Sequence, residues 1–119
     1  MIYISAGPTV PAGKYAAQAL AKAGVKATTK SLETDVKSVV SKVQLGEADA
    51  GIVYATDVKA AGNRVSGVEI PDSYNVEATY PIATLTHTEN SATARAFIEF
   101  VASPDGQSIL GSYGFAPAT

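Results

Sequence analysis

Residues 50–54 have the sequence AGIVY, an unbroken run of apolar side chains between two stretches with helical spacing. A run of this length is typical of a strand buried on both faces of a parallel sheet. Before it, four valines follow at i, i+3, i+4 and i+7 from Val36, which predicts a helix that ends at Gly46. After it, residues 57–61 fit a short helical turn. This order predicts an α/β fold.

The N-terminal segment has the same strand-then-helix pattern. Residues 2–5 are mostly β-branched or aromatic and predict a strand that lies parallel to residues 51–54. A loop leads to Pro11, which suits the first turn of a helix over residues 12–23, and Gly24 ends that helix. We expect the helices that begin near residues 12 and 36 to point their N-termini to one side of the sheet.

The second half of the chain predicts two more strands and two helices. Residues 68–70 fit a short strand, and residues 76–86 alternate as a strand does. Pro81 interrupts the donors of the latter, so it is expected at a sheet edge or as a crossing between lobes. Asn90 caps one helix, and Ser103 caps a last helix that runs to about residue 113. The fold class is α/β, with a mostly parallel sheet flanked by helices.

The composition excludes several classes of function. The chain has 119 residues, a net charge of −2 and no cysteine. It therefore has no basic field for nucleic acid, no polybasic patch for a membrane, no disulfide and no thiolate chemistry. No apolar run approaches the roughly 20 residues of a membrane-spanning helix. No signal peptide precedes the first strand, so we expect either a cytoplasmic protein or a fragment that begins at Met1.

Residues 7–14 invite a nucleotide-binding interpretation, which fails on spacing. A P-loop would need glycine at Pro8 and serine or threonine at Tyr15. Ser5, Asp57 and the lone His87 could be taken for a catalytic triad, but no G-x-S-x-G turn presents the serine. The aspartates have no metal-loop spacing. We expect no enzyme activity, no cofactor and no metal site.

Three positions suit anion binding. The helix starts near Ala12 and Val36 expose N–H groups that attract anions, and Tyr54 ends a strand where α/β sheets gather ligands. Each position also has a plain alternative. Thr34 or Asp35 can cap the second helix, water can satisfy the first, and Tyr54 can be an aromatic residue at the edge of the core. The residues alone leave these alternatives open.

Six segments of the chain carry a combined family signal: residues 10–16, 34–36, 46–57, 80–83, 96–101 and 113–115. The block at residues 46–57 and the alanine–glycine pair before Tyr15 are the most specific of these segments. Together, in this order and spacing, the six segments resemble the molybdate-binding proteins of ABC transporters, a family of bilobal type II solute receptors.

The resemblance implies an oxyanion site built from neutral donors. It assigns the backbone N–H groups of Ala12 and Val36 and the hydroxyl of Tyr54 to a molybdate or tungstate dianion. Two serine ligands would come from an N-terminal lobe. The chain would then be the C-terminal half of a type II periplasmic-binding-protein fold, with lobe II at residues 1–79. Residues 80–119 would be a hinge strand and C-terminal helices returning toward lobe I.

The resemblance further implies a periplasmic or membrane-anchored extracellular receptor that docks on an ABC transporter permease. Two alternatives stay open: a receptor for another small anion, and a half-length interaction domain that dimerises without a role in transport. The helices of residues 92–113 would have an apolar face without its usual partner, including Phe97 and Leu110. We expect that face to repack on the sheet or to be buried in a homodimer.

Overall fold

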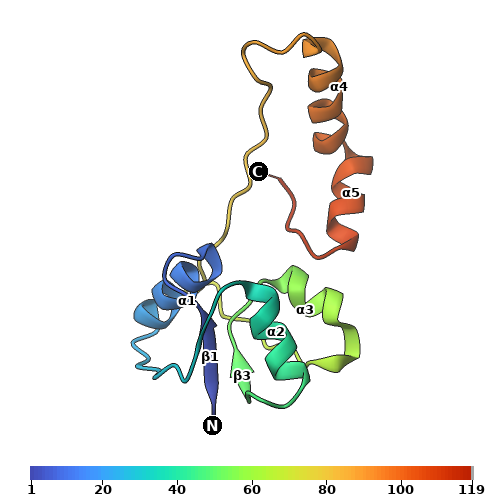
Figure 1. Ribbon diagram of the computed structural model, residues 1–119. Coiled ribbons are helices and arrows are strands. Elements are labelled where there is room, and N and C mark those ends of the chain that lie inside the picture. The colour runs from blue at the N-terminus through green and yellow to red at the C-terminus, as the bar shows by residue number, and fades with distance from the viewer. Residues whose placement is uncertain (119) are drawn as a thin grey trace. The chain divides into compact units, whose positions relative to one another are not determined.

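The computed structural model describes residues 1–118 and divides the chain into two compact units. Unit 1 is Met1–Ala78, and unit 2 begins at Thr79. Unit 1 holds the sheet and three of the α-helices, and unit 2 holds the last two helices (Figure 1). The assignment of residues 1–79 and 80–119 to different lobes of a receptor stays a prediction.

The sheet of unit 1 has three parallel strands in the order β2-β1-β3. The central strand β1, Tyr3–Ala6, pairs with β2, Leu32–Glu33, on one side and with β3, Ala50–Gly51, on the other. The predicted α/β class and the parallel pairing of the first strand with the segment at residue 51 are confirmed. β3 is shorter than predicted, because the chain leaves the ladder before Ile52.

The helices of unit 1 follow the predicted pattern. α1 is Pro11–Lys22, α2 is Val36–Gln44, and α3 is Ala55–Ala61, which the 3-10 turn η1, Gly62–Arg64, extends. α1 and α2 end just before Gly24 and Gly46, which have the positive φ angles of 66° and 74° that glycine adopts at helix ends. α3 begins two residues earlier than the predicted turn. Both α1 and α2 pack on β1 (Figure 1).

Small residues allow the helices to lie close to the sheet. Val39 of α2 is fully buried, and its Cγ1 occupies the position beside Gly51 where a Cβ would come within 2.4 Å. A Cβ on Gly13 of α1 would come within 2.2–2.3 Å of the carbonyl oxygens of Gly7 and Ala6. These glycines therefore fix α2 against β3 and the first turn of α1 against the end of β1.

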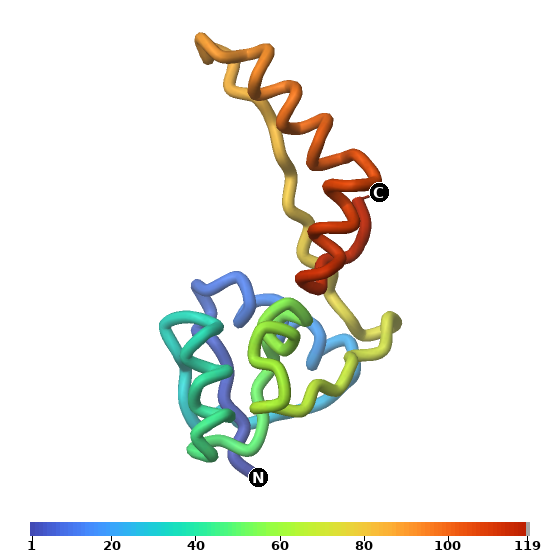
Figure 2. The backbone as a smooth tube through the Cα atoms, turned by 90° about the vertical axis from the view of Figure 1, so that its right-hand side faces the viewer, coloured from blue at the N-terminus to red at the C-terminus, as the bar shows by residue number. Residues whose placement is uncertain are grey.

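The two predicted strands at residues 68–70 and 76–86 are wrong. The described part of the chain has no strand after β3, and the yellow part of the tube in Figure 2 runs extended up to α4. Alternating apolar and polar side chains favour an extended backbone, but a strand also needs a neighbouring strand that pairs with its N–H and C=O groups. Within unit 1 the segment is held by other means, since the Lys22 ammonium donates to the Asn75 carbonyl at 2.8 Å. The strand β2 was not predicted, because two residues carry no periodicity.

Unit 2 consists of α4, Ser91–Ala102, and α5, Pro104–Ser112, which pack on each other. The predicted cap of the last helix is confirmed, since the Ser103 hydroxyl accepts from the Gly106 N–H at 3.2 Å. Asn90 is at the N-cap position of α4, but its side chain makes no capping hydrogen bond. No residue of α4 is buried, and Phe97 is 60% exposed. Of the apolar face expected to seek a partner, Phe97 is therefore exposed, whereas Leu110 is half-buried.

The contact at Gly13 predicts a specific loss of stability. Gly13→Ala should lower the free energy of unfolding of unit 1 by about 1–3 kcal/mol, because the added Cβ meets backbone atoms that cannot move away. Gly111→Ala in α5 is the matched control, since a Cβ there meets nothing within 4 Å and alanine favours helix. The stability of each variant is measured by urea unfolding, monitored through the amide NMR signals of each unit. Equal stability of the two variants would contradict the close contact.

Candidate functional site

The three residues singled out from the sequence lie at the carboxyl ends of the three strands. Ala12 is in the first turn of α1 after β1, Val36 begins α2 after β2, and Tyr54 precedes α3 after β3. Because the strands are parallel, these ends share one edge of the sheet. Ala12 belongs to the hydrophobic cluster around Val39, and Val36 and Tyr54 pack against the same cluster. The structure therefore brings all three together around one core.

The N-terminus of α1 has no side-chain cap. Val10 is the N-cap residue and contributes no capping hydrogen bond, and Pro11 has no N–H. The first helical hydrogen bond is made by the Lys14 N–H to the Val10 carbonyl at 3.1 Å. The N–H groups of Ala12 and Gly13 precede it, so they have no carbonyl one turn back in the helix. Ala12 is only 5% exposed, so these donors lie at a largely buried backbone.

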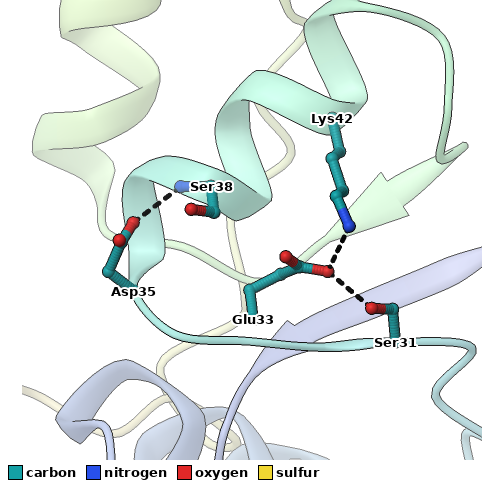
Figure 3. A network of polar contacts seen from close by, with 5 residues as sticks. All are labelled: Ser31, Glu33, Asp35, Ser38 and Lys42. Carbon is teal, nitrogen blue, oxygen red and sulfur yellow. Dashed lines mark hydrogen bonds and ion pairs between the residues drawn. The ribbon is translucent and has the colours of Figure 1, made fainter.

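The N-terminus of α2 is capped by Asp35, one of the two residues considered from the sequence. Its Oδ1 accepts from the Ser38 N–H at 2.8 Å (Figure 3). The Ser38 N–H, together with the Lys37 N–H, holds the pKa of Asp35 below its ordinary value. The carboxylate thus interacts with the N–H groups of Lys37 and Ser38 in the first turn of α2. The N–H of Val36, the first residue of the helix, is not part of this cap. The capped-helix alternative is confirmed for α2, and it leaves one donor for a ligand.

A polar network joins the end of β2 to α2. Glu33 Oε1 accepts from the Lys42 ammonium at 2.8 Å and from the Ser31 hydroxyl at 2.7 Å (Figure 3). The hydrogen bond from Lys42 and then that from Ser31 lower the pKa of Glu33, and Glu33 in turn raises the pKa of Lys42. Sequence analysis missed this network, because an ion pair between a strand and a helix nine residues apart follows no local spacing rule. Its effect is to fix the turn that presents Val36.

Tyr54 is held at its backbone and at its ring. Its N–H donates to Asp57 Oδ2 at 3.0 Å, and its carbonyl accepts from the Asp57 N–H at 3.0 Å. Its ring makes an edge-to-face contact with Tyr15 of α1, with centroids 6.4 Å apart and planes at 66°. Tyr54 is half-buried, as expected for an aromatic residue at the core edge with a polar tip.

The side chains considered from the sequence for catalysis or metal binding do not form a site. Ser5 is buried inside β1, and His87 is exposed. In residues 1–118, no three histidine, aspartate or glutamate side chains cluster as a metal site would require. None of the helices described combines the length and apolar character that crossing a bilayer demands. The arrangement at the sheet edge offers neutral N–H and hydroxyl donors, which suit an anion.

Comparison with known proteins gives one family. The family model for bacterial extracellular solute-binding proteins matches residues 2–116. A molybdate-binding protein of Mycobacterium tuberculosis is 36% identical over 109 residues, which cover 92% of this chain and 42% of the relative. The molybdate-binding protein of Escherichia coli is 33% identical over 89% of this chain and 42% of its own length. The chain thus spans less than half the length of these relatives.

A solved structure extends the similarity to the fold. The substrate-binding domain assigned to a molybdenum ABC transporter from Clostridium difficile has a TM-score of 0.85 and 31% sequence identity. The match covers 99% of this chain and 53% of that chain. A substrate-binding lipoprotein of Bacillus subtilis, assigned to an ABC transporter, is 30% identical over 90% of this chain and 42% of its own length.

The Glu33 network predicts a pH-dependent stability. A folded-state pKa below the ordinary value stabilises the fold above the ordinary glutamate pKa, and this contribution is lost as pH falls through the lowered pKa. The raised pKa of Lys42 adds a contribution that is present below the ordinary lysine pKa and is lost as pH rises through the raised pKa. Glu33→Gln should therefore lower the urea midpoint at neutral pH, and the difference from the parent chain should shrink in acid.

The exposed Glu69 provides a matched control, because Glu69→Gln removes a carboxylate from an irregular stretch of the same unit. It should leave the urea midpoint almost unchanged at every pH. If the urea midpoints of Glu33→Gln and the parent chain still differ by the same amount in strong acid, the charge of the Glu33 carboxylate is not the cause of the difference.

Proposed function

This chain belongs to the family of bacterial extracellular solute-binding proteins, and from that premise we propose that it forms one wall of the molybdate site of an ABC importer's receptor. The observation that carries the proposal is the uncapped, largely buried start of α1 at the carboxyl edge of the sheet. The names of the relatives from Mycobacterium tuberculosis and Escherichia coli support molybdate as the ligand. Tungstate, which has the same charge and shape, is the companion ligand.

The proposed mechanism uses dipoles in place of a countercharge. The N–H groups of Ala12 and Val36 and the hydroxyl of Tyr54 donate to the oxygens of the tetrahedral dianion. Helix N-termini carry partial positive charge, so they stabilise an anion without the strong attraction of a buried lysine or arginine. The ligand remains releasable for this reason. Molybdate is bound as an oxyanion, and the protein needs no cofactor and performs no catalysis.

Asp35, which caps α2, would give this wall a selectivity element. Its carboxylate is committed to the Ser38 N–H and has a lowered pKa, so it is charged at neutral pH. A fixed negative charge near the ligand opposes anions, so binding depends on close hydrogen bonds from Ala12, Val36 and Tyr54. An oxyanion of the wrong size loses those contacts but still meets the repulsion. A receptor for another small anion is the nearest alternative.

The location and the partner follow as parts of the same proposal. A solute receptor of an ABC importer works outside the cytoplasmic membrane and delivers its ligand to the permease. The Bacillus subtilis relative is named a lipoprotein, which supports a membrane-anchored receptor. The serine donors that complete the site would come from a second wall that is not among these 119 residues.

A second candidate is a half-length interaction domain that forms a homodimer. The open apolar face of unit 2 favours it, since Phe97 and Phe100 are 60% and 50% exposed and α4 buries no residue. Exposed aromatic clusters of this kind are typical of interfaces. A second copy could cover the face by exchange of α4 and α5.

Light scattering over a range of concentrations tests the dimer. The chain should show twice its mass at high concentration, and Phe97→Ser should return it to the mass of one chain, because it removes an aromatic side chain from the interface. Lys59→Ser on the exposed side of α3 is a control that should leave the mass unchanged. One chain mass at every concentration would exclude the homodimer.

The anion site is tested by titrating the isotope-labelled chain with molybdate, sulfate and phosphate. Molybdate should shift the amide signals of Ala12 and Val36 most, and Tyr54→Phe should weaken the binding. The affinity of this single wall should be about millimolar or weaker, because three hydrogen bonds of roughly 0.5–3 kcal/mol each must offset an association cost of about 4–15 kcal/mol. Shifts that are equal for all three anions, or absent at Ala12 and Val36, would contradict the proposed site.

A further inference from the structure

An open groove lies between α2 and α3 on unit 1. It has a volume of about 250 Å³, and the two helices that form it contact each other (Figure 1). We propose that this groove binds an acidic peptide segment of a partner protein. The inference goes beyond the proposed function and does not rest on molybdate binding, since none of the three proposed anion donors lines the groove.

Each helix lines the groove with one of its faces. On α2 the lining residues are at positions i, i+3, i+4 and i+7 from Lys37, and on α3 and η1 they are at the same positions from Asp57. Residues with this spacing share one side of a helix. The groove therefore extends along about two turns of each helix, which suits an elongated ligand.

The middle of each face has short side chains. Val40 and Ser41 occupy these positions on α2, and Ala60 and Ala61 occupy them on α3. Such side chains leave room for the backbone of an incoming segment. Sites for small molecules are typically clefts of about 300–1,000 Å³ with a mostly apolar lining. A smaller groove that includes charged residues in its lining fits a peptide better.

Lys37 and Arg64 place two positive charges on the groove. Both residues are exposed, and within residues 1–118 neither forms an ion pair with a carboxylate. The Arg64 Nε donates to the Ala61 carbonyl at 3.1 Å, which holds the base of the guanidinium, and the terminal N–H groups can pair with a carboxylate. The negative charge in the lining is that of Asp57, whose Oδ2 accepts from the Tyr54 N–H at 3.0 Å. The groove thus has an excess of positive charge.

This arrangement favours a peptide over other anionic partners. Segments that bind anionic lipid typically carry four to eight lysines or arginines, whereas the groove has two such residues, Lys37 and Arg64. The net charge of −2 opposes nucleic acid. Arginine is enriched in protein interfaces, where its planar group pairs with carboxylates. A segment with two or more glutamates or aspartates matches both the shape and the charge of the groove.

The charge requirement is tested by titrating the isotope-labelled chain with a capped peptide of four glutamates. The peptide should shift the amide signals of Lys37, Ala60 and Arg64 most, in a saturable manner, and added salt should weaken the binding. Lys37→Gln should weaken it about 1.5- to 5-fold, the factor that corresponds to one exposed ion pair. Lys26→Gln, at an exposed lysine outside the groove, removes the same charge and should bind as the parent chain does.

The shape requirement is tested without a change of charge. Ala60→Leu fills the middle of the groove with a residue that favours helix, and it should remove the saturable shifts. Ala17→Leu, at an exposed alanine of α1, is the matched control and should leave them unchanged. If Ala60→Leu disturbs the fold, the comparison of Lys37→Gln with Lys26→Gln decides, because both lysines are exposed.

Three results would overturn the inference: equal shifts with a capped peptide of four glutamines, shifts centred on the lysines of α1 and the loop after it, or parent-like binding by a folded Ala60→Leu chain. Vesicles of phosphatidylglycerol and phosphatidylcholine test the lipid alternative. If the vesicles shift the groove signals and the glutamate peptide does not, the two cations serve a membrane surface and the inference is wrong. A molybdate titration of the same sample reports separately on the proposed function.

Discussion

The contact of Val39 with Gly51 is the constraint on which unit 1 depends. Val39 is the large side chain that the unit buries completely, and it fits only because residue 51 has no Cβ. It also lies in one cluster with Ile4 of the central strand. α2 is thereby fixed against β1 and β3 at once, and the positions of Val36 at its start and of Tyr54 beyond β3 follow from that packing.

The small residues of this core explain how a short sheet can hold the N-termini of its helices at fixed positions relative to the strands. Long side chains in a core can change rotamer to accommodate a shift of a helix. The contact of Gly13 with the end of β1 cannot adjust in this way, because backbone atoms of β1 and the loop lie directly against the Cα of Gly13. The start of α1 thus has little freedom relative to the strand. The ion pair of Glu33 with Lys42 joins the end of β2 to the last turn of α2, at the β2 edge of the sheet.

Much of this architecture was predictable from the sequence, because periodicity and glycine positions are local signals. α1, α2 and the parallel pair β1–β3 followed from such signals, and Ala12, Val36 and Tyr54 were singled out from helix starts and a strand end. The segments at 68–70 and 76–86 were mistaken for strands because alternation does not reveal whether a neighbouring strand exists. β2, the Glu33–Lys42 pair and the Tyr15–Tyr54 contact depend on which elements become neighbours, and no local pattern encodes that.

The two helix ends at the site differ in charge, and this difference gives the proposed receptor its logic. At α1 the N–H groups of Ala12 and Gly13 are uncapped, so an anion meets the full partial charge of the helix end. At α2 the charged Asp35 carboxylate accepts from the Ser38 N–H and offsets that partial charge. An anion would therefore be attracted by α1 and located by the single N–H of Val36 and the hydroxyl of Tyr54. The start of α1 would attract any anion, whereas the Val36 N–H and the Tyr54 hydroxyl would discriminate between anions by shape. A ligand of slightly different shape would lose these two hydrogen bonds but would still be attracted by α1.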